Sequence, residues 1–398
     1  MTGPVLGKKT VRDIDVAGKR VLVRADLNVP LDGQVITDDT RIRESLATIQ
    51  YLLDHGASAI IVCSHLGRPK GRDESLSLAP VAGRMGNLLN REVLFAADCV
   101  GPAAEDAVAA MLVGSVLLLE NLRFHPEEEA NDPEFARQLA SLAEVFVNDA
   151  FGSAHRAHAS TEGVTHYLPA VAGLLMEKEV RYLSGLVADP PRPFAAVVGG
   201  AKVSTKIAAI DHLLPRLDML LLGGGMANTF LRATGVDVRS SLVEPEQVEV
   251  ARGILDDARA RGVAIHLPVD VVAADRFAAD AESATVPVGQ VPVGYMILDI
   301  GPETVRAYTQ ALQSAKAVVW NGPMGVFEMD KFAFGSFELA RSIAGLHATT
   351  VVGGGETAAV VAHLGLQARF THVSTGGGAS LEMLEGRELP GVAALQDA

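Results

Sequence analysis

The sequence predicts an α/β protein with two doubly wound, Rossmann-like domains, each built on a parallel sheet. Short runs of β-branched and aliphatic residues alternate with amphipathic stretches along the chain, which is typical of βαβ units. With 398 residues and 48% hydrophobic content, the chain is too long for one ordinary core. A Pro-rich break interrupts the pattern near the middle. Together these observations favour two α/β domains over one.

The expected strands fall into two groups, which predict two sheets. In the first half of the chain they lie at residues 20–29, 59–65, 92–97, 115–121 and 144–151. In the second half they lie at residues 195–199, 219–223, 264–272, 296–299, 317–321, 349–353 and 370–375. The Val-Pro-Val repeats within residues 281–294 predict a hairpin excursion.

A helix followed by a Pro-Pro pair predicts the junction between the domains, because proline ends a helix and stiffens the segment after it. We expect an N-terminal domain over residues 1–170, an interdomain helix and hinge over 171–193, and a C-terminal domain over 194–380. We expect the last segment, 381–398, to return to the N-terminal domain.

Composition excludes several classes of partner. The formal net charge is −14 and no Lys/Arg-rich run is present, so nucleic acid is not an expected partner. No apolar run reaches the ~18 residues of a membrane helix, and the N-terminal stretch lacks a cleavable apolar segment. Cys63 and Cys99 lie in or beside apolar runs without a metal-ligand or redox spacing, which predicts two buried thiols in a reducing cytoplasm. The acidic segment 127–134 is interpreted as a solvated turn and helix start.

Cations gather at the ends of the strands in the first half. In an open parallel sheet, ligands bind beyond the carboxyl ends of the strands. The loops there carry Arg24, Asp26, Asn28, His65, Arg68, Arg123, His125, His155, Arg156 and His158, with Arg41 at the start of a helix. In a chain of net negative charge, this set predicts an anionic ligand that bears both carboxylate and phosphate, because the Arg fork bonds such oxygens in pairs.

The strands of the second half end in glycine instead. Gly-rich turns begin at Gly199, Gly223, Asn321, Gly353 and Ser374. Glycine lets the backbone approach a phosphate, and the helix behind each turn offers free N–H groups. Several such turns on one sheet edge predict a nucleotide site.

Two lysines and two familiar motifs refine that prediction. Lys202 and Lys206 are expected one helical turn apart at the start of a helix, where both can reach the same phosphates. No G-x-x-x-x-G-K-[ST] cradle occurs. The G-x-G-x-x-A pattern at Gly353, Gly355 and Ala358 lacks a ribose-binding acid at the end of the next strand, which argues against a dehydrogenase.

Taken as a series, RADLNVP, HLGRP, ENLRF, FGSAHRAHAS, GGAKVSTK, GGGMANTF, WNGPMGVFE and STGGGAS closely resemble phosphoglycerate kinase over essentially the whole chain. The resemblance implies reversible transfer of the acyl phosphate of 1,3-bisphosphoglycerate to Mg-ADP, giving 3-phosphoglycerate and ATP in glycolysis. It also implies a cytoplasmic monomer, an N-terminal domain for phosphoglycerate and a C-terminal domain for ATP/ADP.

The resemblance assigns roles by matching position. Those for the phosphoglycerate are Asp26, Asn28, Arg41, His65, Leu66, Gly67, Arg68, Arg123 and Arg156. Those for the nucleotide are Lys202, Lys206, Gly223, Gly224, Gly225, Asn321, Glu328, Gly354, Gly355, Glu356 and Thr357. Catalytic roles fall to Arg41, Lys202, Gly376, Gly377 and Gly378.

Two departures from the family pattern stand out. RADLNVP replaces the commoner RVDFNVP at two apolar positions, which should affect packing alone. Glu356 occupies the place where the family has Asp as magnesium ligand, and its extra methylene moves the carboxylate by ~1.5 Å. We expect Mg²⁺ binding to survive, through Glu356 or a bridging water.

The resemblance also implies a mechanism. Donor and acceptor would lie on domains that face each other across a hinged cleft and close for in-line transfer. Two alternatives remain at this point. One is a different acyl-phosphate kinase, which would need fewer cations in the first domain. The other is a non-catalytic nucleotide sensor, which would have lost Lys202 or Arg41.

Overall fold

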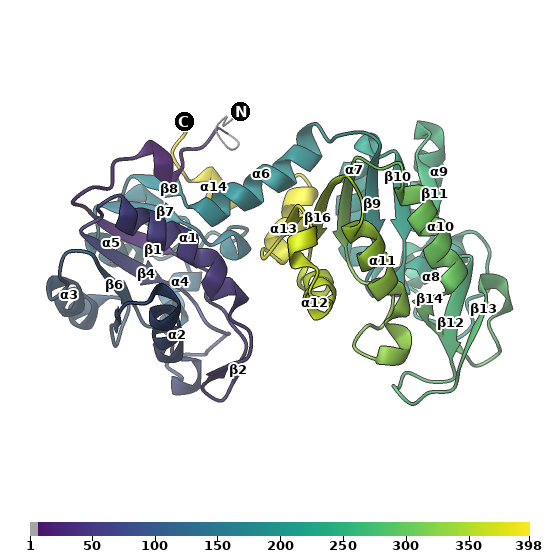
Figure 1. Cartoon of the computed structure of the whole chain (residues 1–398), viewed down its shortest axis with the longest axis horizontal. Helices are drawn as coiled ribbons and strands as arrows, with labels where there is room; N and C mark the ends of the chain where they lie inside the picture. Colours follow the sequence, from purple (N-terminus) through teal and green to yellow (C-terminus); the bar gives the residue numbers. More distant parts are fainter. Residues whose placement is uncertain (1–6) are drawn as a thin grey trace. The chain divides into compact units, whose positions relative to one another are not determined.

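The computed structural model describes residues 7–398, which form two compact units (Figure 1). The first unit runs to Arg181 and includes Glu388–Ala398, and the second unit is Tyr182–Arg387. The division falls inside helix α6 (Leu174–Ala188), within the predicted interdomain segment. The first six residues of the N-terminal stretch lie outside the described residues.

The first unit is built on a six-stranded sheet in the order β5-β6-β4-β1-β7-β8, with every neighbouring pair parallel. Its strands are β1 (Arg20–Arg24), β4 (Ala59–Cys63), β5 (Val93–Phe95), β6 (Ser115–Leu118), β7 (Val145–Asn148) and β8 (Ala170–Ala172). The strands β1 and β4 are buried almost throughout, as expected for a parallel sheet covered on both faces. Strand β8 was not predicted: two of its three residues fall in the segment predicted as the interdomain helix and hinge, 171–193, and three-residue strands carry almost no periodic signal.

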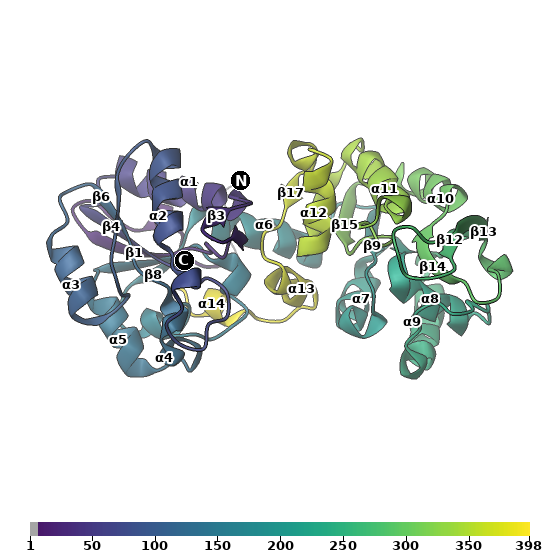
Figure 2. The same cartoon turned by 90° about the horizontal axis from the view of Figure 1, so that it is seen from below.

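Helices cover both faces of this sheet (Figure 2). One face packs on α1 (Thr40–Asp54) and α2 (Ala79–Leu89), whose apolar residues join those of the strands in one core. The other carries α3 (Gly101–Ala109), α4 (Pro126–Glu129) and α5 (Pro133–Ser141). A two-stranded hairpin, β2 (Leu31–Asp32) with β3 (Val35–Ile36), precedes α1.

The second unit has a six-stranded parallel sheet in the order β11-β10-β9-β15-β16-β17. Its strands are β9 (Phe194–Val198), β10 (Met219–Leu222), β11 (Ala264–His266), β15 (Ala317–Asn321), β16 (Thr349–Gly353) and β17 (His372–Val373). In chain order this is the 3-2-1-4-5-6 arrangement of dinucleotide-binding folds. The order reverses between β9 and β15, so ligands are expected at the ends of these two strands.

Helices again lie on both faces (Figure 2). The helices α10 (Pro302–Leu312), α11 (Phe334–Ala344) and α12 (Gly355–His363) pack on one side around Trp320. The other side carries α7 (Ile207–Leu213), α8 (Gly224–Ala233) and α9 (Val248–Arg261). Helix α13 (Gly378–Leu384) follows β17.

Both predicted parallel sheets are present, but some strands predicted for the second belong to a separate three-stranded sheet. Residues 264–272, predicted as one strand, divide into β11 and β12 (Asp270–Ala274), and these belong to different sheets. The strand predicted at 296–299 is β14 (Met296–Ile300), and it pairs antiparallel with β12 instead of joining the main sheet. The third strand, β13 (Ser283–Pro287), lies inside the predicted hairpin excursion and pairs with β12. Pro268, between β11 and β12, has no N–H to continue a ladder, which is a physical reason for the break.

The C-terminal segment is held in the first unit by α14 (Pro390–Ala393) and backbone contacts. Asn148 donates from Nδ2 to the Gly391 carbonyl at 2.9 Å, and Lys8 Nζ donates to the carbonyls of Ala393 and Leu395. Among the described residues, no helix is both long and apolar enough to cross a bilayer.

Candidate active site

An ion pair stands at the carboxyl end of β1. The guanidinium of Arg41, in the first turn of α1, lies 2.6 Å from Asp26 Oδ2. Burial alone raises the pKa of Asp26, but the positive charges of Arg41 and Arg24 and the hydrogen bond from the Asn28 N–H oppose that rise, and the net pKa is lowered. Asp26 is therefore ionised at neutral pH, and Arg41, whose side chain is one-third exposed, keeps part of its surface for a ligand.

His65 follows β4 and is held from behind by Arg24. The guanidinium of Arg24 lies 3.1 Å from His65 Nδ1. Because Arg is a donor only, Nδ1 accepts and the ring proton sits on Nε2. Burial, reinforced by the positive charge of Arg24, holds the pKa of His65 well below its usual range. His65 is thus neutral, with an Nε2–H that can donate.

The loop after His65 is fixed by its neighbours. Asn28 Oδ1 accepts the N–H of Gly67 at 2.9 Å, and Arg123 donates to the Gly67 carbonyl at 2.8 Å. Gly67 has a positive φ of 65°, and an added Cβ would meet the end of the Leu76 side chain at 2.9 Å, so glycine is favoured here. Leu66 beside it is buried.

Two further predicted cations differ in their surroundings. Arg156 donates to His155 Nε2 at 3.1 Å and lies close enough to Arg123 to contribute to the lowering of its pKa, of which burial is the main cause. Arg68, by contrast, is exposed. The structure thus brings Asp26, Arg41, His65 and Arg123 together and leaves Arg68 at the rim.

Glu128 is a buried acid that contacts this cluster through Ser160. The prediction that the acidic segment 127–134 is solvated was therefore wrong at this position. Glu128 is fully buried. Its carboxylate accepts the Ser160 hydroxyl at 2.6 Å and the Ser160 N–H at 2.9 Å, while Arg24 Nε donates to the same hydroxyl at 2.8 Å. Burial raises the pKa of Glu128, and the charge of Arg24 opposes that rise. The run of acidic residues around Glu128 gave no sign that this one turns inward.

In the second unit, the Gly-rich turns line a cavity of about 490 Å³, here called the glycine cavity. Its lining includes predicted residues from four of the five turns: Lys202, Lys206, Asn321, Gly354, Gly355, Glu356, Thr357, Gly377 and Gly378. Gly199 and Gly322, at the ends of β9 and β15, touch backbone to backbone beside it. The cavity therefore sits where the strand order reverses, as the topology requires.

The two lysines were predicted on one helix, and this was wrong. Lys202 precedes a short 3-10 helix, Val203–Thr205, and Lys206 is the residue before α7. Both nevertheless line the glycine cavity. Lys206 Nζ donates to Asn321 Oδ1. Burial lowers the pKa of Lys206, whereas the charge of Glu356 opposes that shift.

Asn321 and Thr357 provide polar groups at the same place. Thr357 Oγ accepts the Gly322 N–H at 2.6 Å. Asn321 is buried, and its Nδ2 makes no hydrogen bond among the described residues. An unsatisfied buried donor costs about 1–3 kcal/mol unless a ligand or water accepts from it. This orphan donor beside the glycine cavity fits a phosphate oxygen.

A second, apolar cavity of about 400 Å³ adjoins the first and shares Gly200, Ala201 and Glu356 with it. Its lining includes Leu242, Phe277, Met296, Leu298 and Val326, none of which the sequence analysis singled out, together with the predicted Gly224, Gly225 and Glu328. Phe277 is 61% exposed and Leu242 49%, which is unusual for large apolar side chains. Such an apolar cavity suits a flat aromatic base. The exposure of Phe277 and Leu242 is the feature that marks it, and exposure cannot be read from the sequence.

Two predicted glycines lie outside both linings. Gly223 has packing constraints of its own, because a Cβ there would lie 2.3 Å from Met324 Sδ. Gly376 is buried and its N–H donates to Ser374 Oγ at 3.1 Å, so that N–H is already engaged. Gly377 and Gly378 do line the glycine cavity.

Glu356 is the candidate metal ligand. It stands exposed in the first turn of α12 and lines both cavities. Mg²⁺ prefers oxygen ligands and commonly uses one or two carboxylates plus substrate phosphates. The exposed Glu356 carboxylate beside Thr357 and the orphan amide of Asn321 fits a magnesium-bound polyphosphate.

Comparison with known proteins shows which family the chain resembles. A family model described as phosphoglycerate kinase matches residues 11–387. Phosphoglycerate kinase from Pelotomaculum thermopropionicum is 59% identical over 98% of this chain and 100% of its own, and that from Moorella thermoacetica is 58% identical over the same shares. A solved phosphoglycerate kinase from Coxiella burnetii superposes with a TM-score of 0.87 at 40% identity, covering 97% of this chain and 98% of its own. One from Pyrococcus horikoshii gives 0.81 at 33% identity over 98% of each chain.

Proposed function

The chain belongs to the phosphoglycerate kinase family, and from that premise we propose how its residues divide the reaction between the two units. The protein is a phosphotransferase of glycolysis. In the reaction of this family, the acyl phosphate of 1,3-bisphosphoglycerate passes to ADP, giving 3-phosphoglycerate and ATP. The observation that carries the division of roles is the contrast between a cationic strand-end surface in one unit and a glycine-lined cavity in the other.

We assign the phosphoglycerate to the first unit. Arg41, His65, Arg123 and Arg156 would bind its carboxylate and its non-transferring phosphate, and the closeness of these side chains to one another supports this assignment. Asp26 fixes Arg41 and is the candidate acceptor for the substrate hydroxyl. Asn28, Leu66 and Gly67 shape the loop, and Arg68 would contribute from the rim.

The nucleotide is assigned to the second unit. Its base would occupy the apolar cavity, with the ribose hydroxyls within reach of Glu328, and its phosphates the glycine cavity beside Lys202 and Lys206. Glu356 would hold Mg²⁺, directly or through water. Bound with the nucleotide, the cation neutralises charge that builds on the phosphate oxygens.

Transfer requires the phosphoryl group to meet both sets of residues. We propose that the units close on their ligands, with α6 as part of the connection. Arg41 and Lys202 would then flank the equatorial oxygens, assisted by the backbone of Gly377 and Gly378. Gly376 would support this turn through its bond to Ser374. No general base is needed, since a carboxylate acceptor is ionised at neutral pH.

The remaining parts of the proposal concern the cell. We propose a cytoplasmic monomer that uses small-molecule substrates and binds neither nucleic acid nor membrane. The net charge of −14 supports the absence of a nucleic-acid partner.

A coupled assay with 3-phosphoglycerate, ATP and Mg²⁺ tests the proposal directly. We expect turnover with 3-phosphoglycerate and none above background with acetate or glutamate as acceptor. Turnover with a simple carboxylate would instead indicate a different acyl-phosphate kinase. Nucleotide binding without turnover on any acceptor would indicate a sensor.

A further inference from the structure

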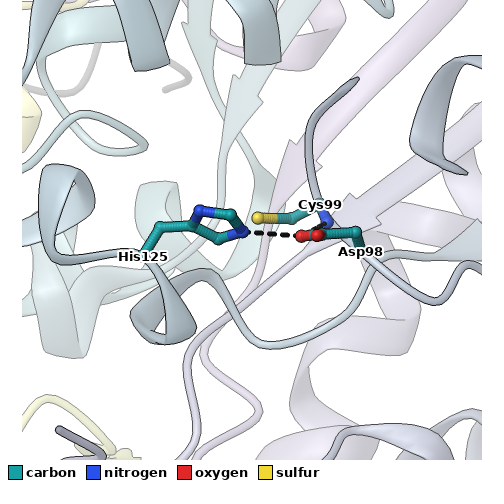
Figure 3. Close-up of side chains that lie close together, drawn as sticks. All are labelled: Asp98, Cys99 and His125. Atoms are coloured by element: carbon teal, nitrogen blue, oxygen red, sulfur yellow. Dashed lines mark hydrogen bonds and ion pairs between the residues drawn. The ribbon is translucent and has the colours of Figure 1, made fainter. Parts of the chain in front are cut away.

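Three metal-ligating side chains meet outside the candidate active site (Figure 3). Asp98 and Cys99 lie in the loop between β5 and α3, and His125 precedes α4. Asp98 and Cys99 are adjacent, but His125 lies 27 residues beyond Asp98, so no short ligand motif marks the group. They meet because β5 and β6 are parallel neighbours in the sheet, and the segments that follow the two strands leave from the same edge.

The donor atoms are close together. One carboxylate oxygen, the Cys99 Sγ and one His125 ring nitrogen all lie within 4.8 Å of one another. His125 Nε2 is 2.6 Å from Asp98 Oδ1. Around a tetrahedral Zn²⁺ with bonds of about 2.0–2.3 Å, ligand atoms stand about 3.3–3.8 Å apart. Small torsional changes that open the Asp98–His125 contact and draw in Cys99 would therefore reach the required geometry.

The surroundings hold two of the ligands in place and leave one side open. Cys99 is fully buried, while the side chains of His125 and Asp98 are 30% and 35% exposed. The Cys99 N–H donates to Asp98 Oδ1 at 2.7 Å, and the His125 ring packs against Phe135 with centroids 5.4 Å apart. A metal here would have three protein ligands and a solvent-facing fourth position.

We propose that Asp98, Cys99 and His125 form a binding site for a divalent transition metal of the Zn²⁺ class. A thiolate, an imidazole and a carboxylate together suit Zn²⁺ and Co²⁺. Mg²⁺ takes oxygen ligands, so the nucleotide's metal would not compete for the thiolate. On binding, the Cys99 thiol releases its proton to solvent, and the two ligand anions balance the 2+ charge. This leaves a neutral cluster beside Arg72, whose guanidinium donates to the Ala97 carbonyl.

Metal binding would join two segments that matter for the substrate. His125 directly follows the 3-10 helix Leu122–Phe124, and its N–H bonds to the Leu122 carbonyl. That helix carries Arg123. A metal on His125 would thus tie the Arg123 segment to the loop after β5 and stabilise the first unit against unfolding.

Titration of the whole chain with Co²⁺ tests the site, with the thiols reduced and nucleotide and Mg²⁺ absent. Absorption spectroscopy should show the ligand-field bands of tetrahedral Co²⁺ and a thiolate-to-cobalt charge-transfer band, both saturating at one equivalent. Added Zn²⁺ should remove both, since it binds such sites more tightly than Co²⁺. Absence of a charge-transfer band in excess Co²⁺ would overturn the proposal.

Matched variants locate the thiolate. Cys99→Ser should abolish the charge-transfer band, and Cys63→Ser, which alters the other buried cysteine, should keep it. A band that survives Cys99→Ser, or disappears in Cys63→Ser, would refute the assignment. Should Cys99→Ser fail to fold, His125→Gln carries the test. We expect it to weaken Co²⁺ binding at least ~10-fold and to remove the Zn²⁺-dependent rise in melting temperature. An unchanged rise in that variant would also overturn the proposal.

Discussion

The two units share one architecture but finish their strands in different ways. In the first unit, strand ends present charged side chains that are already bonded to protein groups, as Arg41 is to Asp26 and Arg123 is to the Gly67 carbonyl. In the second unit, strand ends present bare backbone at Gly199, Gly322 and Gly354, with cations only at the cavity wall.

The difference teaches how each kind of anion site is stabilised before its ligand arrives. Crowded guanidinium groups repel one another, so the first unit places carboxylates such as Asp26 and Glu128 among them. A backbone cradle carries only partial charges and needs no counter-ions. The backbone cradle depends instead on close approach of the main chain to the ligand and to neighbouring main chain, and this requires glycine at particular positions.

The steric side of this comparison gives the largest expected effect. Gly322 has φ +98°, and an added Cβ would lie 2.2 Å from the Gly199 carbonyl oxygen. Gly322→Ala should cost about 4 kcal/mol in the free energy of unfolding, measured by urea denaturation. Gly355→Ala is the control, because nothing lies within 4 Å of its Cβ position. It should fold normally and raise only the KM for nucleotide. Equal stability of the two variants would contradict the contrast.

The charged side of the comparison is tested by removing one cation from each unit. Arg41→Ala and Lys202→Ala should each lower turnover by at least ~10²-fold, the usual scale for a lost transition-state stabiliser. Mg-ADP affinity, measured by calorimetry, should change little for Arg41→Ala, because that residue lies in the other unit. Near-normal turnover in either variant would refute its assigned role.

Glu128 tests whether the first unit needs its buried counter-charge. Glu128→Gln keeps the shape but removes one of the two buried carboxylates near Arg24, which should cost about 1–3 kcal/mol of stability. The KM for 3-phosphoglycerate should rise while that for nucleotide stays constant. Glu129→Gln removes an exposed partner of Arg123 and should cost no more than about 0.5 kcal/mol. Equal losses of stability in Glu128→Gln and Glu129→Gln would contradict a special role for the buried carboxylate.

The pH dependence of stability should differ between the units. Burial raises the pKa of Asp299 in the second unit to about 8 and that of Asp149 in the first to about 6, from 3.8. Because each native carboxyl holds its proton to higher pH than the unfolded one, its contribution to stability is present below about pH 4 and lost as pH rises through the native pKa. The loss ends near pH 6 for Asp149 and near pH 8 for Asp299.

Trp320, the one tryptophan and fully buried in β15, reports unfolding of the second unit. Followed by its fluorescence, the urea midpoint of unfolding should decrease as the pH is raised from about 6 to about 8. The loss of a single proton from Asp299 can lower the free energy of unfolding by at most about 1.4 kcal/mol per pH unit. Asp299→Asn should flatten that slope, although it costs stability at all pH values because its amide meets the N–H of Gly335 or Ile300. An unaltered slope would show that another group titrates there.

Much of the fold and site followed from patterns that parallel sheets impose. Strands β4, β6, β7, β9, β10, β15 and β16 were predicted within a few residues, because each is a short apolar run that ends in polar or glycine-rich letters. The strand-end rule then collected Asp26, Arg41, His65 and Arg123 on one edge without any knowledge of distances.

What the sequence could not predict depended on long-range packing. The split between β11 and β12 requires knowing that the chain leaves one sheet for another. The burial of Glu128 depends on Ser160 and Arg24, which are distant in sequence. The apolar cavity combines single residues from several loops, and the Asp98–Cys99–His125 group joins the ends of two strands, so neither has a local motif.

The discontinuity of the first unit bears on how the protein is made. Residues Glu388–Ala398 pack with residues near the N-terminus, and Lys8 and Asn148 bond to them directly. The ribosome synthesises the chain from the N-terminus, so the whole of the second unit, Tyr182–Arg387, can fold before the first unit has received its last segment, Glu388–Ala398. The first unit is therefore translated first but completes its fold last. Until the end of synthesis, the Ala170 carbonyl in β8 lacks the N–H of Gln396, which is still inside the exit tunnel.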